Sequence, residues 1–329
     1  MKLMRVLVAN HKLSTISGSE TFTYTLVEEL KRRNIEVEYF TFHKGITSNK
    51  IEEELKVEFM SKNRYDLILA NHNTCVKELY SKGFIIQTCH GIYPKLEQPS
   101  IYADAYIAIS NEIQNYLSSL GFPSLLVKNG INLNRYVSKK RIQPNIKRIL
   151  SLCHSDTANS MIKEAISKNN LNIELLEFNK YKNPVWNIED YINDVDLVIG
   201  IGRSLYDAIA CGRNVICFDA RNDYMDSYGD GYLNENIYGS INYNCSGRFS
   251  KKVFTSDDIY NEILKYDVLN GAFLRKFAET ELSIITNVDM YLRYFEELKT
   301  INNRKIYFEV VKNVFGKKTT KQLLRIINK

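Results

Sequence analysis

Several features that would define a protein class are missing from this chain of 329 residues. No run approaches the roughly 20 apolar residues of a membrane-spanning helix. The first residues, MKLMRVLVAN, lack the apolar core and cleavage site of a signal peptide. The 15 glycines and 5 prolines are too few for a long linker, and no solenoid repeat is present. We therefore expect a globular protein of the cytoplasm.

Metal-site and disulfide patterns are missing too. The six cysteines form no CxxC pair and several lie in apolar runs, which favours buried thiols over disulfides. The chain has no HExxH motif and no EF-hand spacing, and its five histidines are scattered. The sequence thus predicts no metal and no resident cofactor.

What the sequence contains is a repeated alternation of apolar strands and amphipathic helices. Strands are predicted at 4–10, 35–42, 65–71, 83–91, 103–110 and 124–130, and again at 147–153, 172–178, 196–202 and 214–219. Residues 220–250 read as loops, and a helix is expected after an N-cap at Thr255 or Ser256. This pattern predicts an α/β protein with two Rossmann-like domains facing a cleft, at 1–140 and 141–300, followed by a tail at 301–329.

The segment GIGRSLYDAIACGRNVICFD, residues 200–219, carries the most specific chemistry. A strand that ends at Gly200 and Gly202 and turns into a helix gathers backbone N–H groups where the helix dipole is positive. Arg203 can add a bidentate phosphate contact beside Ser204. Asp207, one turn later, can accept hydrogen bonds from two ribose hydroxyls. These residues predict a nucleoside diphosphate site. The alternative is a tight turn with a surface ion pair between Arg203 and Asp207.

The same segment resembles the EAMACGxPVI signature of GT-B nucleotide-sugar glycosyltransferases of the family 4 kind, through YDAIACGRNVICFD. That resemblance implies that Asp207 contacts the donor ribose. SGSETFTYTLVEELKRRNIEVEYF is similar to the GGxE loop, helix and strand of the family, which implies that Gly18, Ser19 and Glu20 face the cleft. FIIQTCHGIYP is similar to the strand that ends in a histidine near the donor sugar, which implies His90.

The chain departs from this family pattern at three points. The usual glutamate eight residues before the signature acid is Ile199 here, and the acid itself is Asp207 in place of glutamate. The usual Arg/Lys pair early in the second domain has no clear match, which leaves Lys163 as a substitute and Arg203 for the phosphates. Because of these departures, an inactive, degenerate member of the family stays an alternative.

The resemblance implies a metal-independent hexosyltransferase-like glycosyltransferase. It would move a sugar from a nucleoside diphosphate sugar to a hydroxyl of a saccharide or lipid-linked saccharide, in surface polysaccharide or glycoconjugate synthesis. His90 and Glu20 are the catalytic candidates, although a packing histidine and a helix-stabilising glutamate would explain both. Asn10 and His11 end the first strand and are candidates for the acceptor side. A non-catalytic nucleotide-sugar-binding subunit, a nucleotide-sugar epimerase and a DNA-modifying sugar transferase stay open.

The positive charge is concentrated in the tail. Residues 301–329 contain eight Lys/Arg and one Glu, a net charge of +7 against +6 for the whole chain. Their apolar residues follow helical spacing. Such a helix can lie on an anionic membrane surface, here the inner face, can contact nucleic acid phosphates, or can pack on the body with a solvated basic face.

Overall fold

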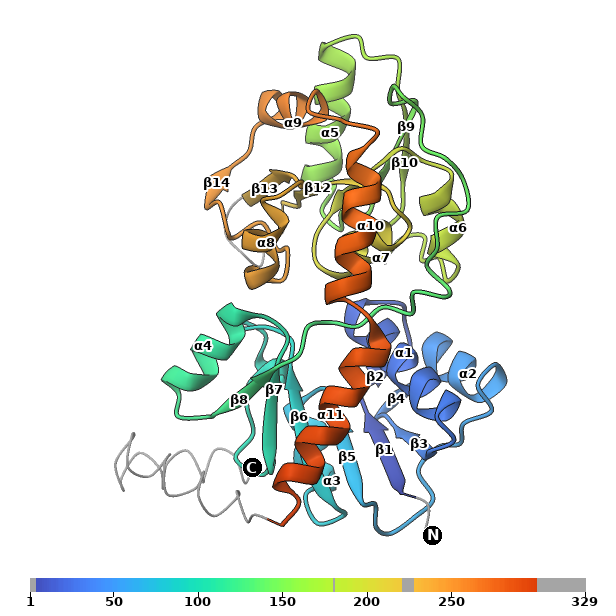
Figure 1. Ribbon diagram of the computed structural model, residues 1–329, viewed down its shortest axis with the longest axis vertical. Helices are drawn as coiled ribbons and strands as arrows, with labels where there is room; N and C mark the ends of the chain where they lie inside the picture. Colours follow the sequence, from blue (N-terminus) through green and yellow to red (C-terminus); the bar gives the residue numbers. More distant parts are fainter. Residues whose placement is uncertain (1–3, 180, 221–227, 301–329) are drawn as a thin grey trace. The chain divides into compact units, whose positions relative to one another are not determined.

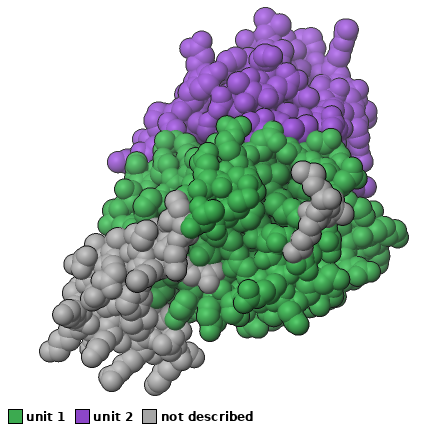
Figure 2. Space-filling view, turned by 60° about the horizontal axis from the view of Figure 1, so that its bottom comes forward, with its two compact units in different colours: residues 1–14, 26–127, 288–329 green, residues 15–25, 128–287 purple. Residues whose placement is uncertain are grey.

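The computed structural model describes residues 4–179, 181–220 and 228–300, which fall into two compact units. Of the described residues, unit 1 holds 4–14, 26–127 and 288–300, and unit 2 holds 15–25 and 128–287 (Figure 2). Each unit contains one six-stranded sheet. The two consecutive α/β halves predicted from the sequence are therefore confirmed.

The chain passes between the units at other points than the predicted boundaries at residues 140 and 300. Ile131 and Tyr136 are buried in the hydrophobic cluster of unit 2, so the polar stretch before residue 140 belongs to that unit. Tyr291 joins unit 1, where its hydroxyl lies 2.8 Å from Thr88 Oγ1. The predicted basic tail, 301–329, lies outside the described residues.

The sheet of unit 1 is wholly parallel, in the order β3-β1-β5-β6-β7-β8 (Figure 1). Its strands are mostly buried on both faces, which explains their continuous apolar sequences. Two short strands, β2 (Lys12–Leu13) and β4 (His43–Lys44), pair separately. The sheet strands are β1 (Arg5–Ala9), β3 (Glu36–Phe40), β5 (Leu67–Ala70), β6 (Phe84–Cys89), β7 (Ala105–Ala108) and β8 (Ser124–Leu126).

Helices connect these strands, as the alternation predicted. Ser110 begins one of them as an N-cap whose side chain accepts from the N–H of Ile113. Gly121 follows the same helix with a φ of 83°, which suits the chain reversal there. The helices are α1 (Gly18–Arg32), α2 (Ile46–Glu53), α3 (Asn73–Leu79), the 3-10 turn η1 (Lys95–Glu97), α4 (Asn111–Ser119) and α11 (Ile284–Leu298). The first two turns of α1 and the first residues of α11 belong to unit 2.

The sheet of unit 2 has the order β10-β9-β11-β12-β13-β14, of which the first four strands are parallel. Thr255 is the N-cap of α9, as predicted, and Asp258 completes a capping box with it. The strands are β9 (Arg148–Ser151), β10 (Glu174–Glu177), β11 (Leu197–Gly200), β12 (Asn214–Phe218), β13 (Tyr228–Tyr232) and β14 (Lys252–Val253). The helices are α5 (Asp156–Lys168), α6 (Ile188–Asn193), α7 (Arg203–Ala210), α8 (Ile237–Ser240), the 3-10 turn η3 (Ile241–Tyr243), α9 (Ser256–Ile263) and α10 (Asn270–Glu281).

The prediction of loops throughout 220–250 is wrong for residues 228–232, which form a strand, and for residues 237–243, which form α8 and η3. The sequence YGDGY forms β13, which pairs antiparallel with β12. Glycine is a poor strand former, so the pattern gave no strand signal. Tertiary packing stabilises this strand instead. A Cβ on Gly229 would come within 2.8 Å of the ring of Phe254, so the ring fills the space of the missing side chain.

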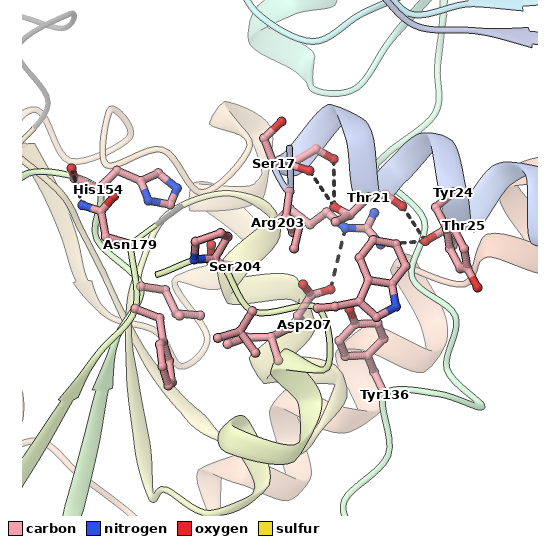
Figure 3. A pocket seen from close by; sticks show the side chains of 18 of the residues that line it. Ser17, Thr21, Tyr24, Thr25, Tyr136, His154, Asn179, Arg203, Ser204 and Asp207 are labelled. Carbon is pink, nitrogen blue, oxygen red and sulfur yellow. Dashed lines mark hydrogen bonds and ion pairs between the residues drawn. The ribbon is translucent and has the colours of Figure 1, made fainter. Parts of the chain in front are cut away.

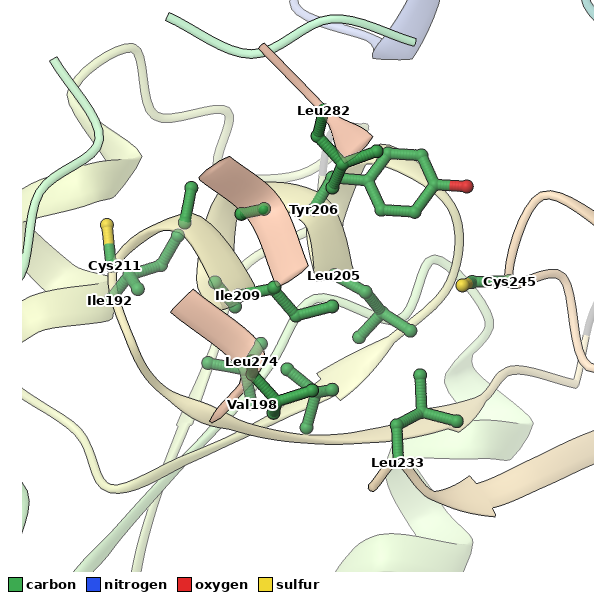
Figure 4. Close-up of a cluster of buried hydrophobic side chains, with 14 of the residues drawn as sticks. Ile192, Val198, Leu205, Tyr206, Ile209, Cys211, Leu233, Cys245, Leu274 and Leu282 are labelled. Carbon is green, nitrogen blue, oxygen red and sulfur yellow. The ribbon is translucent and has the colours of Figure 1, made fainter. Parts of the chain in front are cut away.

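Apolar side chains from the sheet, α7 and α10 form one of the cores of unit 2 (Figure 4). Leu205, Tyr206 and Ile209 of α7 are fully or almost fully buried there, which ties this helix firmly to the sheet beneath it. All six cysteines are buried and none forms a disulfide, as predicted. None of the helices in the described part of the chain has the length and apolarity needed to cross a bilayer.

Candidate functional site

A pocket in unit 2 opens at the carboxyl ends of the parallel strands β9, β10 and β11 (Figure 3). This edge is where open α/β sheets bind ligands. Its empty space, the open mouth included, is about 770 Å³. The lining comprises Ile16, Ser17, Gly18, Thr21, Tyr24, Thr25, Arg135, Tyr136, Leu152, His154, Phe178, Asn179, residues 183–186, Ile188, Arg203, Ser204 and Asp207.

The first turns of α1 and α7 meet in the wall of this pocket. A Cβ placed on Gly18 would lie 3.8 Å from the Cβ of Arg203. The first N–H groups of a helix have no partner within the helix, and the dipole places partial positive charge there. The pocket therefore joins two helix N-termini, an arrangement suited to an anion.

Arg203 is buried, with 7% of its surface exposed, and its guanidinium binds protein acceptors on both sides. Nη1 donates to the carbonyl of Gly130 at 3.1 Å, and Nη2 donates to Thr25 Oγ1 at 3.0 Å. The bidentate phosphate contact expected from the sequence stays a prediction, because in this structure these donors hold α1 and the segment after β8 against α7.

Asp207 lies one turn after Arg203, and the sequence placed it correctly on the same face. Nε of Arg203 is 3.8 Å from Oδ1 of Asp207, but the pair is buried and so is not a surface ion pair. Within the part of the chain that the structure describes, neither of these two atoms makes a hydrogen bond. Burial raises the pKa of Asp207 to about 6, although Arg203 and Arg135 partly offset it. Asp207 thus presents a buried acceptor with unused capacity.

Arg135 and Trp186 also line the pocket. Nε of Arg135 binds Glu189 Oε1 at 2.8 Å, and Nη2 donates to the carbonyl of Trp186 at 3.0 Å. The guanidinium carbon lies 5.4 Å from the Trp186 ring centroid, and the Tyr24 ring meets that ring edge-on at 4.8 Å. The single tryptophan of the chain is therefore held in a defined position beside the pocket.

The turn before α7 is built on Gly202. The sequence predicted that the backbone N–H of Gly202 is directed at a ligand, but this N–H binds another backbone group instead. Gly202 has a φ of 57°, and its N–H donates to the carbonyl of Cys245 at 2.9 Å. Asn244 and Cys245, the residues that pack on this turn, both have positive φ, and the Tyr206 hydroxyl donates to Asn244 Oδ1 at 2.9 Å. Gly202 contributes backbone conformation, because a residue with a Cβ is strained at that φ.

Several predicted donor-site residues are not among those that line the pocket. Gly200 ends β11, where a Cβ would be 3.5 Å from the Cβ atoms of Leu152 and Ser204. Ser19 lies in the first turn of α1, and its carbonyl accepts from Thr23 Oγ1. Lys163, on α5, pairs with Glu177 at 2.8 Å and is largely exposed.

Glu20, a catalytic candidate, is 3% exposed, and both its carboxylate oxygens accept from Thr15 Oγ1, at 3.1 and 2.9 Å. Its position fits stabilisation of the loop before α1 and of the helix start. Its role in chemistry stays a prediction.

His90, the other catalytic candidate, lies at the end of β6 in unit 1. Its Nε2 is 3.0 Å from Oδ1 of the buried Asn71, which orients the ring. At the same edge of the sheet the N–H of His11 donates to Nδ1 of His72 at 3.2 Å. Burial lowers the pKa of His72 to about 4, so this ring is neutral near pH 7. Three strands of unit 1, β1, β5 and β6, are therefore followed by a histidine. The sequence analysis named His11 after β1 and His90 after β6 as candidates, but not His72 after β5.

Several residues of the pocket were not predicted from the sequence, above all His154 and Asn179. Both directly follow predicted strands, so the rule that ligands bind at carboxyl ends of strands was a usable signal for them. Arg135 and Trp186 carried no such signal, since they lie in an irregular segment and in a loop. Among the described residues no group of His, Cys, Asp and Glu side chains is placed to hold a metal ion.

No protein-family model matches the chain, and no curated protein does either. Solved structures do match. HepE from Anabaena, in complex with UDP and glucose, aligns with a TM-score of 0.62 over 90% of this chain and 100% of that one, at 14% identity. An alpha-glucosyltransferase in complex with UDP-glucose and DNA containing an abasic site aligns with a TM-score of 0.50 over 89% and 99%, at 9% identity.

The chain has the GT-B fold. The resemblance seen in residues 200–219 is thereby confirmed at the level of the fold. In GT-B terms the pocket of unit 2 belongs to the second Rossmann-like half, where the sequence predicted the nucleotide.

Proposed function

We propose that the pocket of unit 2 binds a nucleoside diphosphate sugar and that the protein transfers its sugar to an acceptor hydroxyl. The observation that carries this proposal is the buried carboxylate of Asp207 beside two converging helix N-termini. Asp207 lines the pocket, and a ligand hydroxyl that donates to its carboxylate would form a charge-assisted hydrogen bond, which contributes about 1.5–3 kcal/mol.

Each part of such a donor finds a counterpart in the pocket. Asp207 would accept from ribose hydroxyls. The N-termini of α1 and α7, at Gly18 and Ser204, would stabilise the diphosphate, both in the bound donor and as the leaving group. Trp186 would lie near the base. Arg203 would act by holding Asp207 and the two helices in place.

Uridine nucleotides are the first donors to consider. HepE was solved with UDP and glucose, and the alpha-glucosyltransferase with UDP-glucose. Hexosyl transfer is the form of the reaction that we propose. We further propose that helix N-termini supply the positive charge and that no metal is needed. A saccharide or lipid-linked saccharide is the proposed acceptor, and surface polysaccharide synthesis the proposed context. His90 is the proposed group near the reacting sugar, on the basis of sequence resemblance alone.

The donor proposal is tested by titrating the protein with UDP, GDP, ADP and CDP in EDTA while following Trp186 fluorescence. The single tryptophan lines the pocket, so ligand entry changes its surroundings. Thermal unfolding provides a second readout, because a ligand at about 100 times its Kd adds about 2.7 kcal/mol to the stability of the native state. We expect one nucleotide, UDP first, to give both signals.

Asp207→Asn is the variant that localises the signal. It keeps the shape of the side chain and its ability to accept one hydrogen bond, but removes the charge. We expect UDP affinity to fall by about tenfold, the effect of a lost charge-assisted hydrogen bond of about 1.4 kcal/mol. No response to any nucleotide, or full affinity in Asp207→Asn, would contradict the proposed donor site.

Turnover separates transfer from the alternatives. Release of UDP from UDP-glucose that depends on an added acceptor supports a transferase. Conversion of free UDP-glucose to another UDP-sugar would identify an epimerase, and binding without turnover a binding subunit. Duplex DNA belongs among the acceptors tested, because the alpha-glucosyltransferase with this fold was solved with DNA.

A further inference from the structure

His154 occupies the centre of the pocket edge in unit 2. It follows β9, which lies between β10 and β11 in the sheet. Its side chain lines the pocket, on the same side as Asn179 (Figure 3). The pocket that receives the first turn of α7 therefore receives an imidazole from the neighbouring strand as well.

The backbone of His154 is held from both sides by buried polar side chains. Its N–H donates to Asp219 Oδ2 at 3.3 Å, and its carbonyl accepts from Asn179 Nδ2 at 2.9 Å. Asp219, at the end of β12, is 5% exposed, and Asn179 is 6% exposed. Asn179 is itself fixed, because its N–H donates to Asn183 Oδ1 at 2.7 Å. Three strand ends thus cooperate to fix one residue of the lining.

The charges of the lining leave little excess positive charge for a diphosphate. Arg135 is paired with Glu189, and Arg203 faces Asp207. Each arginine of the lining is therefore matched by a carboxylate. Among the described residues of the lining, the remaining basic side chain is His154, an imidazole that can take up a proton.

We propose that His154 contacts the diphosphate of the donor and is protonated when the donor is bound. This inference rests on the proposed function and names the phosphate-binding side chain of that site. The imidazolium would donate a charge-assisted hydrogen bond to a phosphate oxygen and would stabilise the leaving diphosphate.

The surroundings of His154 contain several other charged or titratable groups. Asp219 accepts the backbone N–H, Tyr181 meets the imidazole ring at 6.2 Å, and Asp156 of α5 is paired with Lys182. Across the pocket are Arg203 and Asp207 of α7. Burial raises the pKa of Asp207 to about 6, and its ionised form is the one that accepts the ribose hydroxyls. Ionisation of Asp207 therefore strengthens donor binding as pH rises, whereas loss of a proton from His154 would weaken it.

The test measures the affinity for UDP-glucose and for uridine between pH 5 and 8, by Trp186 fluorescence. The diphosphate of UDP-glucose keeps its charge over this range, so changes in affinity belong to the protein. The variants are His154→Gln, which is neutral, and His154→Lys, which stays positive. Circular dichroism and the unfolding temperature establish that each variant is folded.

We expect the affinity of the wild type for UDP-glucose to rise up to about pH 6 as Asp207 ionises and to fall about tenfold towards pH 8. His154→Lys keeps the first change and loses the second. His154→Gln binds UDP-glucose about tenfold more weakly at pH 6 with no decline above it, while uridine binding is unchanged in both variants.

Two results would overturn the inference and leave the donor site standing. One is wild-type affinity for UDP-glucose in His154→Gln. The other is an equal loss of uridine and UDP-glucose binding, which would mean that His154 only shapes the pocket. A wild-type protein that binds neither compound nor any other nucleotide would instead refute the proposed function itself.

Discussion

Replacing Arg203 by methionine removes a buried cation that joins three segments of unit 2. Its guanidinium donates to the Gly130 carbonyl and to Thr25 Oγ1, and it lies 3.8 Å from Asp207. Hydrogen bonds from charged donors contribute about 1.5–3 kcal/mol each, and breaking a buried ion pair costs about 3–5 kcal/mol in total. We expect Arg203→Met to lower the free energy of unfolding by about 4 kcal/mol near pH 7.5.

A double-mutant cycle with Asp207→Asn isolates the charge interaction. At 3.8 Å and an effective dielectric constant of about 20, opposite unit charges attract by about 4 kcal/mol, before desolvation is subtracted. We therefore expect a coupling energy of about 1–3 kcal/mol. Urea unfolding followed by Trp186 fluorescence measures it, since Trp186 lies in the unit concerned.

The effect of Arg203→Met depends on pH in a direction set by Asp207. The folded protein raises the pKa of this carboxyl from 3.8 to about 6, so the folded state binds the proton more tightly than the unfolded state. Stability therefore falls as pH rises between these values. Without Arg203 the pKa rises further and the loss extends to higher pH. The difference in stability between wild type and Arg203→Met should be smaller at pH 5 than at pH 7.5.

Arg213→Met is the matched control. Arg213 is also a buried arginine, 1% exposed, and it donates to the carbonyls of Lys140 and Val195 and to Asn193 Oδ1, away from the pocket. It should cost comparable stability without coupling to Asp207→Asn. Additivity within about 0.5 kcal/mol in the Arg203 cycle, or equal coupling in the Arg213 cycle, would refute this account of Arg203.

Two further predictions concern backbone geometry and a helix cap. Gly202→Ala introduces a Cβ at a φ of 57° in the turn before the lining residues Arg203 and Ser204, and it should cost about 1–2 kcal/mol in urea unfolding and weaken nucleotide binding. Gly212→Ala, at a φ of 68° after the end of α7, should cost similar stability and leave binding unchanged. Equal affinities in the two variants would argue against a role of the Gly202 turn in the site. Thr255→Ala removes the N-cap of α9 and should lower the free energy of unfolding by about 1 kcal/mol. Lys252 and the Thr255 cap lower the pKa of Asp258 to about 2, so NMR titration should show a higher Asp258 pKa in the variant. An unchanged Asp258 titration would show that the cap does not form in solution.

Much of the fold follows from local sequence patterns. Buried parallel strands must be continuous apolar runs, so β1, β5, β6 and β11 could be located within a few residues from sequence alone. The start of α9 was predictable because an N-cap threonine is a local hydrogen-bonding device. β13 was not, because YGDGY becomes a strand only through pairing with β12 and cover from Phe254.

Sequence by itself determined the two consecutive α/β halves of the GT-B fold and the helix that carries Arg203 and Asp207. Two residues four positions apart on a helix share a face whatever their surroundings. Tertiary structure alone decided what these side chains do. It brought Thr25 and Gly130, 178 and 73 residues away, to the Arg203 guanidinium, buried Asp207 beside it, and placed His154 in the lining of the same pocket. The physical reason is that strand order, unlike strand position, is set by long-range packing, so the set of strand ends that meet in one pocket is not written in any local pattern.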